Sequence, residues 1–215
     1  MKDVTPLAPV SIMREAIRHL QAADPVMRAI IERVGAYRIQ FLEPAFETLV
    51  KSIVYQQLSG RVAQVIFARL LSAVPGGGLT PQNILALRPE KMRKLGLSKQ
   101  KTVYIRDLAR HTRDGSIDFG GLAELTDEEV IERLTQVKGV GVWTAHMFLI
   151  FALRRTNVLP SGDLGIRAAI RKAYGLPELP KPAEIDVIGQ RWHPYCTVAA
   201  WYLWRSMEPG AGANL

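Results

Sequence analysis

Hydrophobic residues recur along most of this chain with the spacing of one face of a helix. Between Phe46 and Val54, apolar residues lie three and four positions apart, which is the period of an amphipathic α-helix. The same pattern predicts helices over residues 11–20, 25–34, 44–58, 64–74, 101–110, 142–153, 164–174 and 197–207, with shorter ones from residue 81 and over 92–95. Only residues 36–40 alternate in a way that predicts a short strand. The pattern predicts an all-α, or mainly α, fold.

Local signals indicate where several of these helices begin and end. Asp24 followed by Pro25 is typical of an N-cap and first helical position. Thr126 and Glu129 have the spacing of a capping box, which predicts a further helix from residue 127. The helix predicted over 142–153 is apolar nearly all round, which favours a buried central position. Residues 177–182 are interpreted as a stiff connector and residues 209–215 as a frayed tail.

The composition narrows the class of protein. No apolar run in the 215 residues is long enough to span a membrane, and the start of the chain lacks the apolar core of a signal peptide. We therefore expect a cytoplasmic protein. A single cysteine, Cys196, excludes a disulfide framework, a cysteine-rich zinc site and a cysteine-ligated iron–sulfur cluster.

Basic residues outnumber acidic ones and gather in one segment. The formal net charge is +8, which suits a polyanionic partner. One short stretch carries six basic residues against Glu90 alone: Arg88, Lys91, Arg93, Lys94, Lys99 and Lys101. This basic stretch is interpreted either as part of a nucleic-acid surface or as a solvated helix face.

Two glycines form a distinctive junction before the apolar helix. In the sequence Lys138-Gly139-Val140-Gly141 they flank a single valine, and glycine permits a tight turn because positive φ costs it nothing. Such a turn, together with the next helix N-terminus, directs backbone amides to one place and favours a phosphate. Lys138 adds positive charge there. An ordinary turn between two helices is the other interpretation.

An aspartate follows about twenty residues later in a Gly/Pro-rich loop. Asp163 stands directly before the helix predicted over 164–174, with Pro160 and Gly162 preceding it. An aspartate at this place is typical of an N-cap. The same carboxylate could also face a cleft.

These two segments, in this order and at this distance, resemble the helix–hairpin–helix Gly/Pro–Asp superfamily of DNA glycosylases. The resemblance extends from about His19 to Trp204. It implies two helical lobes, one formed by residues 1–45 with 160–215 and one by 46–159. It also implies that the hairpin grips the backbone of damaged double-stranded DNA. A structural Na⁺ or K⁺ held by hairpin carbonyls is expected at Thr135, Val137 and Val140, and no other cofactor is required.

The resemblance implies a catalytic role for Asp163. A carboxylate beside the sugar stabilises the positive charge that develops when an N-glycosidic bond breaks, once the nucleotide has left the stack. Some members carry a lysine nucleophile two residues after the second glycine, which forms a Schiff base. Trp143 occupies that position here, so the resemblance implies a monofunctional enzyme without lyase activity.

The aromatic-rich segment 192–204 resembles the C-terminal helix of the 3-methyladenine DNA glycosylase II group. Aromatic residues at helical spacing are more often core, but the resemblance places Trp204 in a base pocket together with Trp143 and Met147. Indole faces attract a purine made cationic by alkylation. The resemblance therefore implies excision of alkylated purines such as 3-methyladenine in base excision repair. Met147 replaces a pocket tyrosine of that group, which puts the range of lesions in doubt.

Two further segments resemble DNA-contacting parts of the family. Residues 53–59 resemble the loop whose side chain fills the gap left by the flipped base, a role for Gln57 or Leu58. Ser98 and Lys99 resemble the start of a secondary phosphate-binding helix. A monomer associated with the nucleoid is expected. Two other functions are consistent with the residues: excision of a deaminated or oxidised base, and non-catalytic DNA binding through the hairpin.

Overall fold

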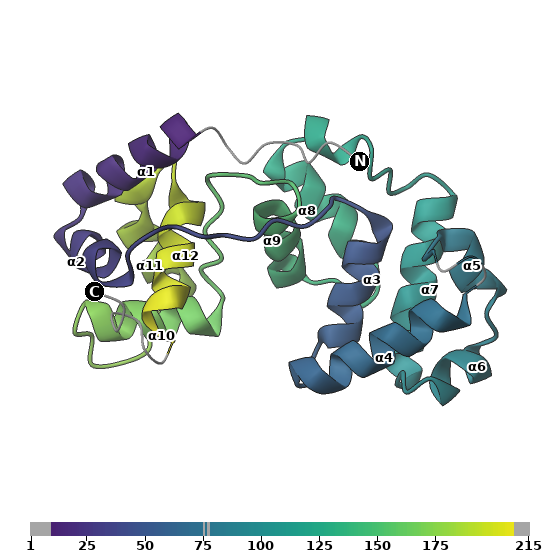
Figure 1. The fold of residues 1–215 in the computed structure, drawn as a ribbon. Coiled ribbons are helices and arrows are strands. Elements are labelled where there is room, and N and C mark those ends of the chain that lie inside the picture. The colour runs from purple at the N-terminus through teal and green to yellow at the C-terminus, as the bar shows by residue number, and fades with distance from the viewer. Residues whose placement is uncertain (1–9, 75, 77, 209–215) are drawn as a thin grey trace. The chain divides into compact units, whose positions relative to one another are not determined.

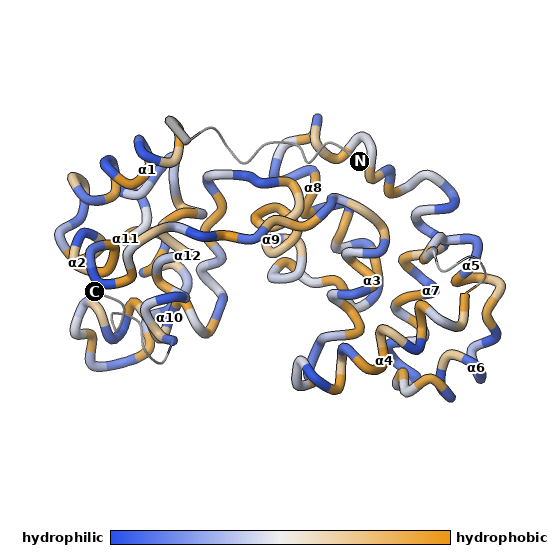
Figure 2. The backbone as a smooth tube through the Cα atoms, in the orientation of Figure 1, coloured by the Kyte–Doolittle hydropathy of each residue, from blue (hydrophilic) through white to orange (hydrophobic). Residues whose placement is uncertain are grey.

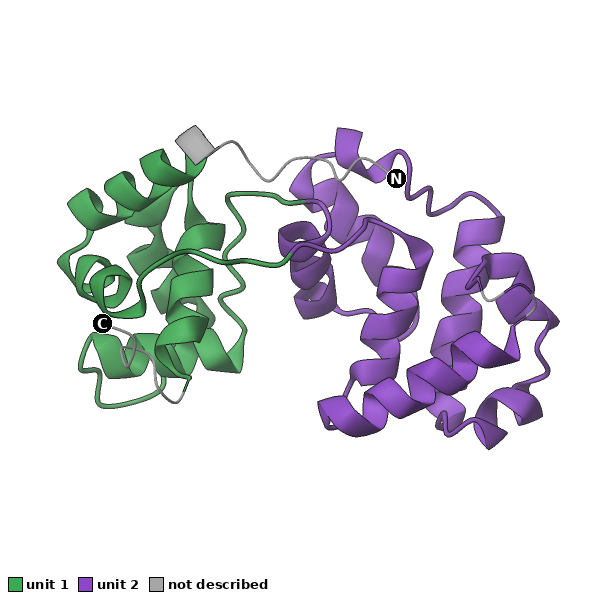
Figure 3. Ribbon diagram, in the orientation of Figure 1, with its two compact units in different colours: residues 1–40, 154–215 green, residues 41–153 purple. Residues whose placement is uncertain are grey.

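The computed structural model describes residues 10–74, 76 and 78–208, and the chain divides into two compact units (Figure 3). Unit 1 comprises residues 1–40 and 154–215, and unit 2 comprises residues 41–153. The sequence analysis placed the corresponding boundaries at 45/46 and 159/160. The predicted tail over 209–215 lies outside the described residues.

The described residues form helices and contain no strand, so the all-α prediction is confirmed. None of the helices they form has the length and apolarity that crossing a bilayer requires. The predicted helices are all present, most of them with ends shifted by one to four residues, because terminal turns fray and are fixed by local caps.

Unit 1 is built from two segments that are distant in the sequence (Figure 1). Its helices are α1 (Val10–Ala23), α2 (Pro25–Val34), α10 (Leu164–Ala173), α11 (Pro182–Gly189) and α12 (Cys196–Ser206). Helix α12 packs against α2 and α10, and α1 packs against α2. The core is formed by fully buried side chains that include Leu20, Met27, Trp192 and Tyr202. The C-terminal segment therefore completes the core against which the N-terminal helices pack.

A buried carboxylate, Asp24, joins these segments. It accepts hydrogen bonds from the backbone amides of Val26 (2.9 Å) and Met27 (3.3 Å), which confirms the predicted N-cap of α2. Its Oδ2 also accepts from Trp192 Nε1 (2.9 Å) and from the hydroxyl of Tyr174. Burial opposes ionisation of Asp24, but these four donors outweigh it and hold its pKa below the ordinary value.

Unit 2 is continuous in the sequence. Its helices are α3 (Phe46–Tyr55), α4 (Gly60–Ala73), α5 (Pro81–Ala86), α6 (Pro89–Lys94), α7 (Lys99–Arg113), α8 (Asp127–Thr135) and α9 (Val142–Phe151). Helix α7 contacts α3, α5 and α6, while α8 packs against α9. The capping box predicted at Thr126 and Glu129 is confirmed at the start of α8.

Figure 2 shows most of α9 as hydrophobic, as expected for a central helix. The prediction of a buried central helix is wrong for its first turn, where Val142 and Trp143 are exposed. The later residues Phe148, Leu149 and Ile150 are buried. The first turn follows the glycine junction directly and projects beyond the core.

The strand predicted over residues 36–40 is wrong, because this segment has no strand partner among the described residues. Its alternation has another cause. The ring of Tyr37 packs on Trp201 of α12 with centroids 4.6 Å apart, and Ile39 is buried. An extended segment lying on a helix thus buries every second residue, as a strand in a sheet would.

The connector predicted over residues 177–182 ends where an unpredicted helix, α11, begins. Pro182 is the first helical residue, and the Glu184 carboxylate accepts the backbone N–H of Lys181 at 2.6 Å. A proline followed two residues later by a glutamate is typical of a helix start. The sequence therefore contained the signal for α11.

Candidate active site

The carboxylate of Asp163 is fixed at the N-terminus of α10. Its Oδ1 accepts the backbone N–H of Ile166 at 2.8 Å, so the predicted N-cap is present. The same oxygen accepts Nε1–H of Trp204 at 2.9 Å. The side chain is only partly buried. Two donors from separate helices therefore hold a carboxylate that solvent can still reach.

Trp204 lies on α12, and its indole nitrogen is directed at Asp163. The other aromatic residues of the segment behave differently, since Trp192, Trp201 and Tyr202 are buried in the core of unit 1. The core interpretation therefore holds for these three. Trp204 is the exception, because its ring is half-buried and its N–H orients the candidate catalytic group.

Gly165 is a site residue that the sequence analysis did not single out. A Cβ at this position would lie 3.0 Å from Oδ1 of Asp163 and 3.2 Å from Cδ1 of Trp204. Both distances are shorter than an ordinary van der Waals contact. Glycine at this position leaves the space in which carboxylate and indole meet. The available signal was a second glycine two residues after the aspartate.

The segment between α8 and α9, residues 137–141, forms a tight turn that we call the hairpin. Gly139 has φ +81°, a left-handed conformation that favours glycine. The flanking valines, Val137 and Val140, are buried and fix the turn to the core of unit 2. A Cβ at Gly139 would lie 2.0 Å from the ring of Tyr104. The first glycine is therefore required both by its backbone and by its neighbour.

Three of the hairpin amides already have partners inside the protein. Val137 N–H is bonded to the Leu134 carbonyl, and Val140 N–H donates to the Val137 carbonyl at 3.0 Å. Lys138 N–H donates to Oδ2 of Asp107 at 3.0 Å. The expectation that successive amides converge on a phosphate is thus too broad. The amides of Gly139 and Gly141 are the two for which the described residues provide no acceptor.

Replacing Gly139 by alanine should lower the midpoint of thermal unfolding. The left-handed backbone alone costs an alanine about 1–2 kcal/mol, and contact with the ring of Tyr104 adds to it. Gly141→Ala is the matched control, because its φ is −94° and a Cβ there would meet open space. Equal unfolding midpoints for the two variants would contradict the close contact between Gly139 and Tyr104.

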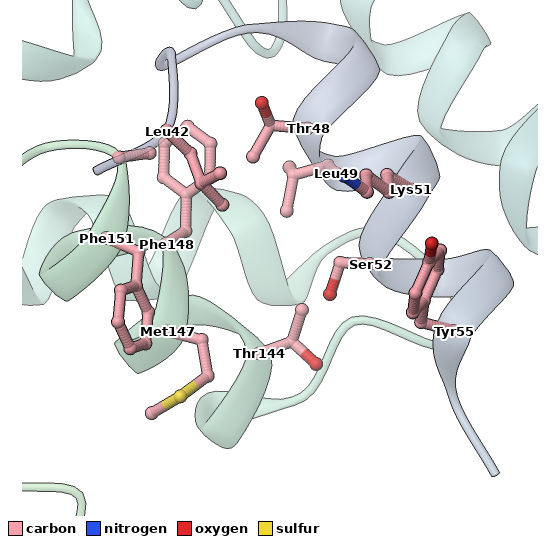
Figure 4. Close-up of a pocket in the computed structure, with 11 residues that line it drawn as sticks. Leu42, Thr48, Leu49, Lys51, Ser52, Tyr55, Thr144, Met147, Phe148 and Phe151 are labelled. Atoms are coloured by element: carbon pink, nitrogen blue, oxygen red, sulfur yellow. The ribbon is translucent and has the colours of Figure 1, made fainter. Parts of the chain in front are cut away.

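An apolar pocket of about 220 Å³ lies between α3 and α9 within unit 2 (Figure 4). Met147 lines it, together with the hydroxyl residues Thr48, Ser52, Tyr55 and Thr144. Cavities of about 150 Å³ admit benzene, so this pocket offers room for a planar ring. Trp143 does not line the pocket, and its side chain is 49% exposed on the first turn of α9. Of the two base-pocket residues predicted in unit 2, Met147 therefore lines this pocket and Trp143 lies exposed outside it.

Residues 56–59, which we call the wedge loop, connect α3 to α4. Gln57 has φ +56°, a conformation that is uncommon for a residue other than glycine. Its side chain and that of Leu58 are both exposed. The preceding residue, Gln56, donates from Nε2 to the carbonyl of Gly139 at 2.9 Å. Both candidates for the intercalating side chain thus lie at the tip of a loop that is bonded to the hairpin.

The sequence pattern of the HhH-GPD superfamily of base excision DNA repair proteins matches residues 50–194 of the chain. This chain belongs to that superfamily. A match of this extent includes both the hairpin and the Asp163 loop. The fold resemblance stated from the sequence is therefore confirmed.

Several named proteins are similar to the chain over most of its length. DNA-3-methyladenine glycosylase 1 of Schizosaccharomyces pombe is 37% identical over 205 residues, covering 93% of this chain and 90% of the relative. A structure of the S. pombe 3-methyladenine DNA glycosylase with abasic DNA has a TM-score of 0.78 at 37% identity, covering 88% of this chain and 95% of that one. The DNA-3-methyladenine glycosidase from Bacillus halodurans has a TM-score of 0.81 at 34% identity, covering 99% and 93%.

Membership of the HhH-GPD superfamily leaves the roles of individual residues as predictions. Ser98 caps α7, with its Oγ accepting the amide of Lys101 at 3.1 Å. Ser98 and Lys99 line a surface hollow of about 440 Å³ that Arg93, Lys94 and the acidic Glu90 also line. Three basic side chains against one carboxylate leave the hollow with a positive balance, which suits a phosphate.

The hairpin carbonyls of this HhH-GPD protein were predicted to hold a monovalent cation. The Val137 carbonyl accepts an amide within the turn and keeps a second lone pair. The side chain of Thr135 is engaged with the carbonyls of Ile131 and Glu132. Only the backbone oxygens of Thr135, Val137 and Val140 would then contact Na⁺ or K⁺, which is compatible with a hard cation that prefers oxygen ligands. The cation site stays a prediction.

Proposed function

We propose that this chain is a monofunctional DNA glycosylase that removes alkylated purines, such as 3-methyladenine, from double-stranded DNA in base excision repair. The observation that carries the proposal is the placement of Asp163, a partly exposed carboxylate held by the Ile166 amide and the Trp204 indole. The similar proteins of S. pombe and B. halodurans, named a DNA-3-methyladenine glycosylase and a DNA-3-methyladenine glycosidase, support this choice of substrate.

The proposed reaction is hydrolysis at the anomeric carbon. As the N-glycosidic bond breaks, its electron pair leaves with the base and the sugar becomes positively charged. The negative charge of Asp163 stabilises this oxocarbenium-like state. A water oxygen then bonds to the anomeric carbon and its proton passes to Asp163 or to solvent, which leaves an abasic sugar. Trp204 contributes by keeping Oδ1 of Asp163 in a fixed orientation.

The pocket in unit 2 has no carboxyl or imidazole group that could protonate a departing base. None of its lining residues is an aspartate, a glutamate or a histidine. The one charged lining side chain, Lys51, has its Nζ over the rings of Tyr55 (5.7 Å) and Phe67 (5.9 Å). A purine alkylated at a ring nitrogen is already cationic and needs no general acid in order to leave. The lack of such an acid in the pocket is therefore compatible with alkylated bases.

The residues near the hairpin do not favour lyase chemistry. Trp143 stands where a Schiff-base lysine would be required, and an indole cannot attack a sugar carbon in this way. Lys138 lies before the glycines, with its exposed side chain on the side proposed to contact phosphates. We expect the abasic strand to remain intact after base release.

DNA binding is assigned to three parts of unit 2. The amides of Gly139 and Gly141, with the charge of Lys138, would hold a backbone phosphate, and the cation at the hairpin would assist. Gln57 or Leu58 would fill the space of the everted nucleotide. Ser98 and Lys99 would contact a second phosphate. We propose that a single copy of the chain acts on nucleoid DNA.

Base release from a panel of lesion-bearing duplexes tests the proposal. Duplexes with 3-methyladenine or 7-methylguanine should release base, whereas 8-oxoguanine and uracil should not. Treatment with borohydride should trap no covalent protein–DNA adduct. Release of only uracil or oxidised guanine would establish the alternative lesion, and binding without any release would establish a non-catalytic module. Either result would overturn the proposal.

A further inference from the structure

One face of α7 carries three side chains that reach toward other segments of unit 2. Lys101, Tyr104 and Asp107 are spaced three residues apart, which places them along one side of a helix. All three are partly or fully buried. The sequence alone assigned no role to Tyr104 or Asp107. It placed Lys101 in the basic stretch.

The ammonium group of Lys101 is directed into the protein. Its Nζ donates to the carbonyl of Val54 at 2.8 Å and to that of Gln56 at 2.5 Å. These carbonyls belong to the last turn of α3 and the first residue of the wedge loop, where helix carbonyls lack a partner of their own. Lys101 thus caps α3 and fixes the start of the wedge loop with two hydrogen bonds from a charged donor.

Tyr104 and Asp107 contact the hairpin. The ring of Tyr104 fills the space beside Gly139, and the carboxylate of Asp107 accepts the Lys138 amide at 3.0 Å. Arg110 and His111 lie 3.9 Å and 3.8 Å from the Asp107 carboxylate and are the charged or titratable groups that face it. One helix, α7, therefore contacts both the wedge loop and the hairpin.

A hydrogen bond also joins the wedge loop directly to the hairpin. The side chain of Gln56, from the wedge loop, donates to the Gly139 carbonyl at 2.9 Å. The wedge loop is thus linked to the hairpin in two ways. Gln56 binds the hairpin directly, and Lys101 binds the loop to α7, which itself contacts the hairpin. The next residue, Gln57, is in its left-handed conformation at this fixed point.

We propose that α7 sets the distance between the wedge loop and the hairpin, and that Lys101 and Gln56 are positioning residues for base eversion. The inference rests on the proposed function. Eversion requires one side chain to enter the duplex while a neighbouring phosphate is gripped, so the two segments must keep a constant separation. Lys101 then serves DNA binding through the wedge loop and makes no phosphate contact itself.

A comparison of Lys101→Met with Lys99→Met tests this inference, because each removes one positive charge from α7. The reporter is 2-aminopurine fluorescence beside a tetrahydrofuran abasic analogue, which brightens when the base unstacks. Lys101→Met should reduce this signal in the bound complex and reduce kcat/KM about tenfold, the order expected for losing hydrogen bonds from a charged donor. The salt dependence of its DNA affinity should match that of wild type.

Lys99→Met should show the opposite behaviour. Loss of a phosphate contact weakens binding and lowers the slope of log affinity against log salt by about 0.9, while the bound complex keeps the wild-type fluorescence. A lowered slope in Lys101→Met, with normal fluorescence, would overturn the inference by showing that Lys101 is a phosphate contact.

Gln56→Leu provides a second variant in case Lys101→Met unfolds, since the hydrogen bond that it removes is exposed. It should reduce fluorescence in the same way, and the double variant should lose less than the product of the two effects. For both variants the loss of kcat/KM should shrink when the lesion stands opposite an abasic site, because an unpaired base is easier to evert.

The possible failures are distinguishable. Wild-type protein that releases no alkylated base would overturn the proposed function, and the fluorescence comparison would still decide the role of α7. Wild-type fluorescence in both Lys101→Met and Gln56→Leu would overturn the inference alone.

Discussion

Replacing Asp163 by asparagine should reduce single-turnover base release by on the order of 10²–10³-fold while DNA affinity stays within about twofold of wild type. Asparagine is as good an N-cap as aspartate, and its Oδ1 can still accept the Ile166 amide and the Trp204 indole N–H. The substitution therefore preserves these two hydrogen bonds and removes the negative charge. The measurement is base release with enzyme in excess, alongside a binding titration on the same duplex.

Two further variants show whether the loss is due to the charge of this one carboxylate. Asp186→Asn makes the same chemical change at an exposed position of α11 in the same unit and should release base at the wild-type rate. Trp204→Phe keeps an aromatic ring and removes the N–H donor, so it should reduce the rate by less than Asp163→Asn. Full activity of Asp163→Asn would refute the proposed mechanism.

Replacing Asp24 by asparagine should destabilise the protein by roughly 2–4 kcal/mol. The –NH₂ group of asparagine cannot accept a hydrogen bond, so at least two buried donors would lose their acceptor. Each unsatisfied donor costs about 1–3 kcal/mol. The donors concerned are Nε1 of Trp192 and the hydroxyl of Tyr174, or the amides that begin α2. Denaturant unfolding followed by circular dichroism measures the loss. Asp114→Asn, at an exposed carboxylate bonded to Ser116, is the control and should change the unfolding midpoint little.

The effect of Asp24 should depend on pH in acid. Its pKa in the folded state lies below the ordinary value of 3.8, so the unfolded state binds the proton more tightly. The stabilisation is complete above about pH 5 and is lost as the pH falls through the ordinary pKa and then the lower pKa of the folded state. The difference between wild type and Asp24→Asn should be constant above pH 5 and narrow below pH 4. A difference that grows in acid would contradict this assignment.

The helices could be predicted from sequence because their signals are local. Apolar residues recur within one turn, and the caps at Asp24 and Thr126 lie within three residues of the amides that they bind. The strand at residues 36–40 was wrong because alternation reports burial of every second residue and does not identify the partner. Here the partner is a helix, to which Tyr37 and Trp201 contribute.

The functional roles of site residues could be predicted only where those residues stand in a recognisable motif. Asp163 and the hairpin glycines stand in such motifs, whereas Gly165 acquires its importance from Trp204, which is remote in the sequence. Lys101 shows the same limit. Composition placed it with five other basic residues on a charged surface, but its ammonium lies against two backbone carbonyls of α3 and the wedge loop. Contacts between distant segments set these roles, and no short pattern reports them.

The discontinuous build of unit 1 has a consequence for synthesis on the ribosome. Unit 2 is one uninterrupted stretch and can complete its core as soon as α9 has emerged, since domains fold as units from the N-terminus onward. The first two helices must wait, because Trp192 and Tyr202, which complete their core, are translated last. Nascent chains arrested before α12 should therefore contain a protease-resistant central fragment and a cleavable leading segment.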